Sequence, residues 1–258
     1  MQDINAALVQ LDLVWENKKA NLEKFDKIFA NEIPDKTDLI VIPEMFTTGF
    51  SMNPEKNAEE MDGATMQWMS KHAKEKNAVI TGSIIISENN NFYNRLIWMR
   101  PDGTYETYDK RHLFTLAGEQ NHYQAGNKKL IVDFKGWKVA PFICYDLRFP
   151  VWIRNKEDYN LIVLVANWPQ RRALQWESLL FARAIENQSF LLAVNRIGND
   201  FNDVYHTGES MAISPIGKFI IKATDIETVL HVKISAQDLM KARKQMPFLN
   251  DRDNFEIV

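Results

Sequence analysis

The stretch that decides the fold covers residues 138–150 and reads KVAPFICYDLRFP. A short, mostly apolar run leads to Cys144, the only cysteine of the chain, and polar residues and a proline follow at once. An apolar run bounded by turn signals predicts a buried strand. A thiol at the exit of such a strand is a candidate nucleophile, although a free cysteine is more often a small buried hydrophobic residue. Other parts of the chain must decide between these two interpretations.

The composition is that of a globular protein with a large core: 258 residues, 45% hydrophobic and 25% charged. The 31 Lys and Arg nearly balance the 34 Asp and Glu, and a net charge of −3 gives no electrostatic reason to expect nucleic acid or an anionic membrane as a partner. The longest apolar runs are far shorter than the ~18 residues of a membrane span. The N-terminus does not have the pattern of a signal peptide, and a single cysteine suits a reducing compartment. We therefore predict a cytoplasmic protein.

Apolar periodicity predicts strands and helices in alternation. Strands are predicted at 4–11, 39–42, 78–87, 92–100, 104–108, 130–134, 137–143, 161–166, 189–197, 210–221 and 227–234, with a turn at 214–217 inside the segment 210–221. Helices are predicted from an N-cap at Asn17 and at 65–76, 149–158, 173–187 and 236–245. The segment 113–127 is predicted to be irregular. A strand-helix-strand pattern around Glu44 is repeated around Cys144, and no linker or low-complexity tract divides the chain. The pattern indicates an α/β layered protein folded as a single domain over residues 1–258.

Three further charged residues are candidates for chemistry. Glu44 ends the second apolar strand and has apolar neighbours on both sides, where an unpaired carboxylate would be costly to bury. Lys110 follows a strand within YDKRHLF, a context that more often gives a solvated basic surface. Glu119 lies in the irregular segment and by itself would be expected at the surface.

Other sites have little support in the sequence. The glycines form neither G-x-G-x-x-G nor a Walker loop, so no nucleotide phosphate site is indicated. The five histidines lack H-E-x-x-H spacing, and a structural zinc site is not expected with one cysteine. A Cys–His pair of the papain type remains open through His112 or His206.

Taken together, three segments resemble the nitrilase superfamily of carbon–nitrogen hydrolases. They are Pro43-Glu44-Met45, then 108–113 (YDKRHL), then 143–150 (ICYDLRFP), and they occur in the family's order of Glu, Lys and Cys. Within the superfamily the chain is most similar to the bacterial omega-amidases, through 144–152 (CYDLRFPVW), 165–169 (VANWP) and 183–188 (RAIENQ). The resemblance implies an α-β-β-α sandwich, a homodimer, and hydrolysis of the ω-amide of 2-oxoglutaramate or 2-oxosuccinamate without a metal or organic cofactor.

The resemblance also implies a role for each candidate. Cys144 would attack the amide carbon, and Glu44 would act as the general base and acid. Lys110 and the backbone N–H of Tyr145 would stabilise the oxyanion. Glu119 falls where many family members have a second active-site glutamate, although it could equally form a structural ion pair with Lys110.

The part of the site that holds the acyl group is less defined by sequence. A substrate carboxylate calls for a cation, and Arg148, Arg171 and Arg172 are near in sequence. Arg148 could instead pair with Asp146 or another carboxylate and hold the cysteine loop, which is the role that we favour here. Phe50, Phe114 and Trp168 could form walls of the pocket, although aromatic residues more often belong to the core.

Two alternatives and one partner prediction complete the expectations. The same scaffold could be an aliphatic amidase, a nitrilase or a carbamoyl-group hydrolase, or an inactive scaffold that binds a partner, which the complete Glu-Lys-Cys set disfavours. The aromatic residues of the C-terminal tail, about 246–258, are surplus for a free tail and predict a dimer interface.

Overall fold

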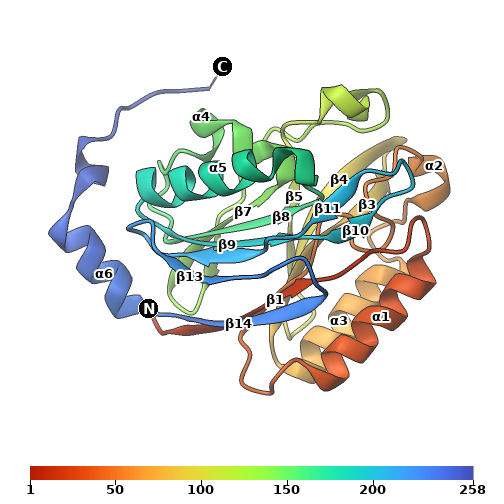
Figure 1. Ribbon diagram of the computed structural model, residues 1–258, viewed down its shortest axis with the longest axis horizontal. Coiled ribbons are helices and arrows are strands. Elements are labelled where there is room, and N and C mark those ends of the chain that lie inside the picture. The colour runs from red at the N-terminus through yellow and green to blue at the C-terminus, as the bar shows by residue number, and fades with distance from the viewer. Residues whose placement is uncertain (258) are drawn as a thin grey trace.

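The structure, a computed structural model, describes residues 1–257 and forms two six-stranded sheets flanked by helices (Figure 1). The first sheet has the strand order β14-β1-β2-β3-β4-β5 and the second β13-β12-β9-β8-β7-β6. In each sheet three neighbouring strands are parallel, β1-β2-β3 and β7-β8-β9, and antiparallel strands extend the edges. This is the predicted α/β sandwich, with sheets in the middle and helices outside.

The bounds of the elements are as follows. The strands of the first sheet are β1 (Ile4–Gln10), β2 (Leu39–Val41), β3 (Val79–Glu88), β4 (Asn91–Met99), β5 (Tyr105–Asp109) and β14 (Thr228–Ile234). Those of the second are β6 (Val132–Phe134), β7 (Trp137–Ile143), β8 (Leu161–Ala166), β9 (Phe190–Asn195), β12 (Met211–Ile213) and β13 (Phe219–Lys222). A separate hairpin pairs β10 (Ile197–Asn199) with β11 (Tyr205–Thr207). The helices are α1 (Lys18–Asn31), α2 (Pro54–Asn57), α3 (Ala64–Lys76), α4 (Pro150–Ile153), α5 (Ala173–Glu186) and α6 (Ala236–Gln245).

The alternation of side chains along β1 explains why the first sheet can separate two cores. Ile4, Ala6 and Leu8 belong to the core shared with the second sheet. Ala7 and Val9 face the other way, into the core shared with α1 and α3. Successive strand residues point to opposite faces, so a strand buried on both sides must be apolar throughout.

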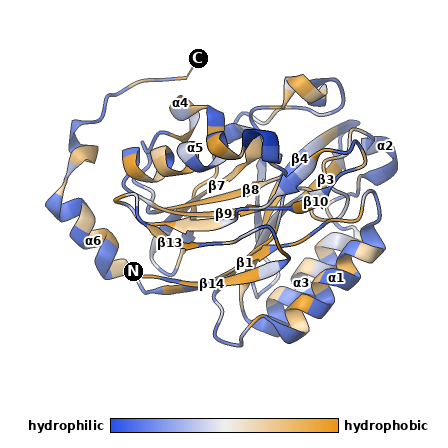
Figure 2. Ribbon diagram, viewed as in Figure 1, coloured by the Kyte–Doolittle hydropathy of each residue, from blue (hydrophilic) through white to orange (hydrophobic). Residues whose placement is uncertain are grey.

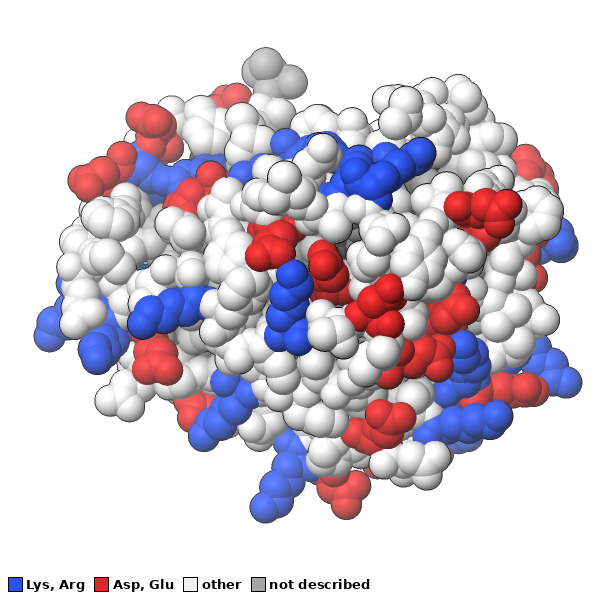
Figure 3. All heavy atoms as spheres, in the orientation of Figure 1, with Lys and Arg blue, Asp and Glu red and all other residues white. Residues whose placement is uncertain are grey.

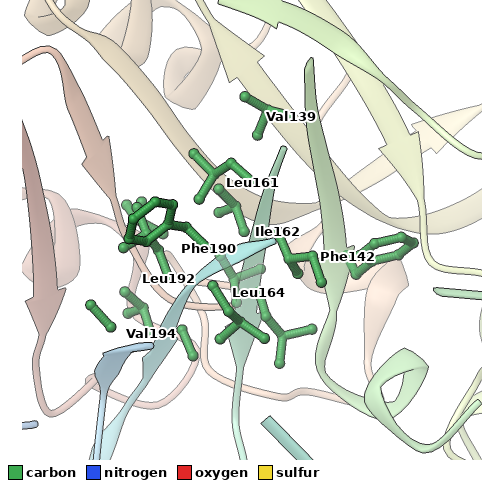
Figure 4. Close-up of a cluster of buried hydrophobic side chains, with 14 of the residues drawn as sticks. Val139, Phe142, Leu161, Ile162, Leu164, Phe190, Leu192 and Val194 are labelled. Carbon is green, nitrogen blue, oxygen red and sulfur yellow. The ribbon is translucent and has the colours of Figure 1, made fainter. Parts of the chain in front are cut away.

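The second sheet is equally buried. Every residue of β7 except Lys138 is buried, as are all residues of β8 and β9. Figure 4 shows side chains of these strands gathered in one cluster: Val139, Phe142, Leu161, Ile162, Leu164, Phe190, Leu192 and Val194. In Figure 2 the central strands are hydrophobic and the helices outside them are hydrophilic along their outer faces. Within residues 1–257, no helix is both long and apolar enough to cross a membrane.

Most predicted elements are confirmed, and Asn17 caps α1 by accepting a hydrogen bond from Ala20 N at 3.0 Å. The helix predicted over 149–158 is wrong beyond α4. Buried Asn155 accepts a hydrogen bond from Tyr159 N at 2.9 Å and donates one to Tyr159 O at 2.8 Å, so its side chain replaces the helical pattern of the backbone. The segment predicted over 210–221 forms two strands, β12 and β13, and the turn predicted at 214–217 joins them. The hairpin β10–β11 was not predicted.

Candidate active site

Glu44 follows β2 and is fully buried at the carboxyl end of the parallel strands. Its Oε1 accepts hydrogen bonds from Lys110 Nζ at 2.9 Å and from Asn94 Nδ2 at 2.8 Å. Its Oε2 accepts one from the backbone N–H of Asn167 at 2.8 Å. These donors compensate for the cost of burying the polar atoms of Glu44.

Lys110 follows β5 and its side chain is also buried, not solvated as its surroundings in the sequence suggested. Its Nζ lies 2.9 Å from Glu44 Oε1 and 2.9 Å from Glu119 Oε2, and 5.0 Å from the centre of the Phe50 ring. Burial opposes the charged form, but Glu119 and then Glu44 outweigh it and raise the pKa of Lys110. The side chain is therefore an ammonium that shares its charge between two carboxylates.

Glu119 begins a 3₁₀ turn, Glu119–Asn121, and is fully buried although the sequence alone would place it at the surface. Its Oε2 accepts a hydrogen bond from the backbone N–H of Phe114 at 2.5 Å, so it also fixes the loop that carries Phe114. Burial raises the pKa of Glu119, Lys110 lowers it and Glu44 raises it, with a net increase. The ion pair with Lys110 that was left open is present in the structure.

Cys144 is the first residue after β7 and begins the 3₁₀ turn η3 (Cys144–Arg148). Its backbone has φ 42°, a left-handed conformation that is uncommon for residues other than glycine. The thiol lies 4.0 Å from the carbonyl oxygen of Asn167, the residue whose N–H binds Glu44. Burial, and then Glu44, raise the pKa of Cys144 well above its usual value, so the resting group is a thiol.

Asp146 holds this turn in place. One carboxylate oxygen accepts hydrogen bonds from Tyr108 Oη at 2.7 Å and Ile143 N at 3.1 Å. The other accepts from the backbone N–H of His112 at 3.0 Å and lies 2.8 Å from His112 Nδ1. Tyr108 and His112 flank Lys110, so a single buried carboxylate fixes the cysteine turn against the lysine loop.

A cavity of about 250 Å³ opens onto the thiol. Its lining includes every pocket residue predicted from sequence: Phe50, Phe114, Cys144, Tyr145, Arg148 and Trp168. It also includes residues that sequence reasoning gave no role: Met52, Ala117, Asn167, Pro169, Asp200, Asn202 and Val204. His206, a candidate partner of Cys144, lines it too. Asp200, Asn202 and Val204 lie at the tip of the unpredicted hairpin, which explains why they were missed.

The role favoured for Arg148 is wrong. Within residues 1–257 no ion pair joins Arg148 to Asp146, whose oxygens are used by Tyr108, Ile143 and His112. Arg148 instead donates a hydrogen bond to Gln175 Oε1 at 2.5 Å and lies 4.8 Å from the centre of the Trp168 ring, at the wall of the cavity.

Three asparagines position the site and were not identified as functional from sequence. Asn94 donates to Glu44, and Asn167 donates to Glu44 through both its backbone and its side chain. Asn195 accepts a hydrogen bond from Trp168 N at 2.7 Å and donates one to Trp168 O at 2.9 Å. The available signal was an amide side chain inside or at the end of an apolar strand, where an unpaired polar group would be costly.

The two histidines considered as partners of Cys144 occupy different surroundings. His112 is bound to Asp146 and stacks on Phe149 with ring centres 3.6 Å apart. His206 lines the cavity, and its Nδ1 lies 3.3 Å from the carbonyl oxygen of Gly198. In the described part of the chain, no group of three or more His, Cys, Asp or Glu side chains is arranged to hold a metal ion.

A buried Glu-Lys-Glu network lies beside a cysteine at the end of a strand, in a sandwich of two sheets. This combination indicates the class of protein to which the chain belongs. Residues 5–244 match the carbon–nitrogen hydrolase family, and the chain belongs to that family. The structure superposes on a CN-hydrolase superfamily protein of Xanthomonas campestris, which has an arsenic adduct in its active site, with a TM-score of 0.97, 39% identity and all of both chains covered.

Curated relatives show which enzymes of the carbon–nitrogen hydrolase family this chain is similar to. The chain is 42% identical to omega-amidase YafV of Escherichia coli K12, with all of both chains covered. It is 31% identical to 2-oxoglutaramate amidase of Bacillus subtilis, covering 94% of this chain and 95% of the relative. The predicted membership of the nitrilase superfamily, with likeness to omega-amidases, is confirmed. The protein is an amide-hydrolysing enzyme.

Proposed function

We propose that the enzyme is an omega-amidase that converts 2-oxoglutaramate and 2-oxosuccinamate to the 2-oxo dicarboxylate and ammonia through a thioester on Cys144. The observation that carries the proposal is the buried Glu44–Lys110–Glu119 network next to the only thiol, at the base of a small cavity. The names of the relatives that match over nearly the full length support the substrate class.

In the acylation step Glu44 removes the thiol proton as Sγ attacks the amide carbon. Because the resting cysteine is protonated, a base must act at the moment of attack. Glu44 is the carboxylate connected to the cysteine through Asn167. It then gives this proton to the amide nitrogen, the carbon–nitrogen bond breaks, and ammonia leaves the acyl-enzyme.

The oxyanion of the tetrahedral intermediate needs donors that are in place before the reaction. Lys110 Nζ supplies a charged donor that two carboxylates hold in position. The N–H of Tyr145 belongs to the first residues of a helical turn, whose N–H groups have no partner within the turn. Together they form the proposed oxyanion site.

In deacylation a water molecule takes the place of ammonia. Glu44 accepts a proton from the water as its oxygen attacks the thioester carbon, and it returns the proton to the departing thiolate. Glu119 holds the Lys110 ammonium and the N–H of Phe114, and so orients the donor through both steps. The product is a carboxylate, and the enzyme regains its thiol.

The cavity is suited to a small acyl group. Its volume of about 250 Å³ accommodates a short amide and not an extended polymer. Glutamine differs from 2-oxoglutaramate by an ammonium, which is costly to bury without a free carboxylate. Asp200 lines the cavity, but its Oδ1 already accepts hydrogen bonds from Asn202 N at 2.8 Å and Val204 N at 3.0 Å.

The test is ammonia release from 2-oxoglutaramate, 2-oxosuccinamate, glutamine, asparagine, butyramide and a nitrile, with Cys144→Ala as the control. We expect kcat/KM for the two 2-oxo amides to exceed the others by at least about 10²-fold, since mismatches that leave buried polar groups unpaired are costly. Cys144→Ala should keep its fold and lose turnover. If butyramide or a nitrile were the best substrate, the omega-amidase assignment would fall and the cysteine chemistry would survive.

A further inference from the structure

Three arginines, Arg148, Arg171 and Arg172, line the cavity that contains Cys144. Of the eight arginines elsewhere in the chain, five lie within 3.1 Å of a carboxylate oxygen: Arg95, Arg100, Arg183, Arg196 and Arg252. The other three donate hydrogen bonds to backbone carbonyl oxygens: Arg111, Arg154 and Arg243. Within residues 1–257, the three arginines of the cavity have no carboxylate partner at ion-pair distance. Figure 3 shows Lys and Arg atoms gathered above a hollow on this face of the molecule, with Asp and Glu atoms below it.

Two of the three guanidinium groups are held by aromatic faces. Arg148 lies 4.8 Å from the ring centre of Trp168, and Arg172 lies 5.0 Å from that of Phe114. Both arginines are half-buried, whereas Arg171 is exposed at the rim. The N–H edge of a guanidinium stacked on a ring matches a carboxylate with two parallel hydrogen bonds. One nitrogen of Arg148, Nη2, already donates to Gln175 Oε1 at 2.5 Å, and its other N–H groups have no partner in the described part of the chain.

Like charges brought together at a partly buried wall repel each other unless an anion joins them. Burial, and then the neighbouring Arg171, lower the pKa of Arg172. Arg95 shows the contrast: burial opposes its charge, but Asp109 and Glu88 raise its pKa. The wall also lies at the start of α5, where Arg172 is the N-cap and makes no side-chain capping bond. The first N–H groups of this 14-residue helix add positive potential.

We propose that Arg148 and Arg172 form a clamp for the substrate's carboxylate, and that Arg171 attracts the anion at the rim without binding it directly. The identity of the substrate rests on the proposed function, whereas the clamp requires only a short amide with a carboxylate at its far end. The amide lies at Cys144 and the carboxylate at the arginine wall. Asp200, Asn202 and His206 on the hairpin side complete the cavity and supply no cation at pH 7, because burial lowers the pKa of His206 to about 4.

The experiment compares two amides that differ only at the end that the arginine clamp would bind. In 4-oxopentanamide a methyl group replaces the carboxylate of 2-oxoglutaramate. We expect Arg148→Gln and Arg172→Gln to lower kcat/KM for 2-oxoglutaramate by about 10- to 100-fold each, the cost of a charge-assisted hydrogen bond. The loss should lie mainly in KM, and hydrolysis of 4-oxopentanamide should change less than about threefold.

Matched variants keep the test specific. Lys244→Gln removes one exposed positive charge remote from the cavity and should leave both amides unaffected. Arg171→Gln should reduce kcat/KM for 2-oxoglutaramate only at low salt, because salt screens the charge of an exposed side chain at the rim. Arg172→Lys retains the charge but cannot form two parallel hydrogen bonds. Its kcat/KM for 2-oxoglutaramate should therefore lie between those of Arg172→Gln and the wild type. Equal losses for the anionic and neutral amides would overturn the clamp.

A binding measurement separates the clamp from the proposed function. Cys144→Ala is titrated with 2-oxoglutarate by calorimetry, alone and combined with Arg172→Gln. Binding that weakens at least about tenfold in the double variant supports the clamp even if 2-oxoglutaramate proves a poor substrate. Unchanged binding, together with rapid hydrolysis of 2-oxoglutaramate by the wild type, would overturn the clamp and leave the proposed function intact.

Discussion

Lys110 connects activity and stability because it is the cation between two fully buried carboxylates. Lys110→Met removes a proposed oxyanion donor, and we expect kcat to fall by about 10²- to 10³-fold. It also leaves Glu44 and Glu119 without their cation, so the free energy of unfolding should fall by about 3–5 kcal/mol. Steady-state ammonia release and urea unfolding measure the two effects.

A second substitution separates these effects. In Lys110→Met combined with Glu119→Gln, one of the unpaired carboxylates becomes a neutral amide that can still accept a hydrogen bond from Phe114 N. Much of the lost stability should return, and the activity should not. A double variant that recovered both would show that Lys110 contributes to catalysis only by maintaining the fold.

His206 gives the protein a defined pH dependence. Burial, and then the nearby Arg196, lower its pKa from 6.5 to about 4. Between these values the unfolded chain binds more protons than the folded one, so the free energy of unfolding decreases as the pH falls. The contribution lost between pH 7.5 and pH 5 is about 2 kcal/mol.

The measurement for His206 is a difference between two proteins. Urea unfolding of the wild type and of His206→Asn at both pH values cancels the titration of all other groups. Asparagine keeps an N–H donor for the carbonyl oxygen of Gly198, so the variant is expected to fold. If the two proteins lost the same stability on acidification, His206 would not be the group responsible.

Among the elements, the η3 turn depends on Asp146 to hold Cys144 at positive φ. Asp146→Asn replaces an acceptor of several hydrogen bonds by a group with one acceptor oxygen. Buried donors are then left unpaired, and we expect a loss of about 3 kcal/mol in the free energy of unfolding. The cysteine and the lysine loop also lose their common support, so kcat should fall while KM changes little.

Tyr108→Phe is the matched control for Asp146, because it removes only the hydrogen bond of 2.7 Å from Tyr108 Oη. We expect it to cost about 1 kcal/mol and to leave kcat within a few-fold. A kcat in Asp146→Asn that matched the one in Tyr108→Phe would count against a positioning role for Asp146.

The sequence predicts best those elements whose burial is evident from a run of apolar residues. Leu161 to Ala166 is apolar throughout and forms β8 as predicted. The prediction of a helix over 149–158 failed because the side chain of Asn155 donates hydrogen bonds to the carbonyl oxygens of Tyr159 and Asn187, and Asn187 is distant in sequence. The hairpin β10–β11 was missed because it is short, polar and held by tertiary contacts, including Arg196 to Asp12 at 2.7 Å.

The active site, too, could be predicted from the sequence only where it does not depend on contacts between distant residues. The strand ends at Glu44 and Cys144 could be placed from apolar runs alone. The burial of Lys110 could not, because its loop is polar and both its carboxylate partners are distant in sequence or separated by a turn. Arg148 was assigned to Asp146 by nearness in sequence, whereas Asp146 is saturated by residues from the lysine loop.

At the scale of the whole molecule, apolar side chains remain exposed on one group of elements. Leu174 and Ile185 on α5 are 81% and 48% exposed, and Phe248 in the C-terminal tail is 58% exposed. In Figure 1 the tail leads from α6 toward α4 on the same side of the molecule as α5. Arg252 in the tail pairs with Asp158 at 2.7 Å, so the tail is tied to its own chain. An apolar surface of this kind is suited to covering by a second copy.

We therefore predict a homodimer that uses α5 and the tail. Light scattering at micromolar concentration should give twice the mass of one chain, and Leu174→Glu combined with Ile185→Glu should give the mass of one chain, because charges in an apolar two-fold contact are unpaired. Ile226→Glu is the matched control: Ile226 is 59% exposed, lies between β13 and β14, and its substitution should leave the dimer intact. A chain that ends at residue 245 tests the tail separately and should weaken dimerisation without changing the hydrogen bonds of Cys144, Glu44 and Lys110. A wild-type protein that scattered as a single chain would refute the prediction for both α5 and the tail.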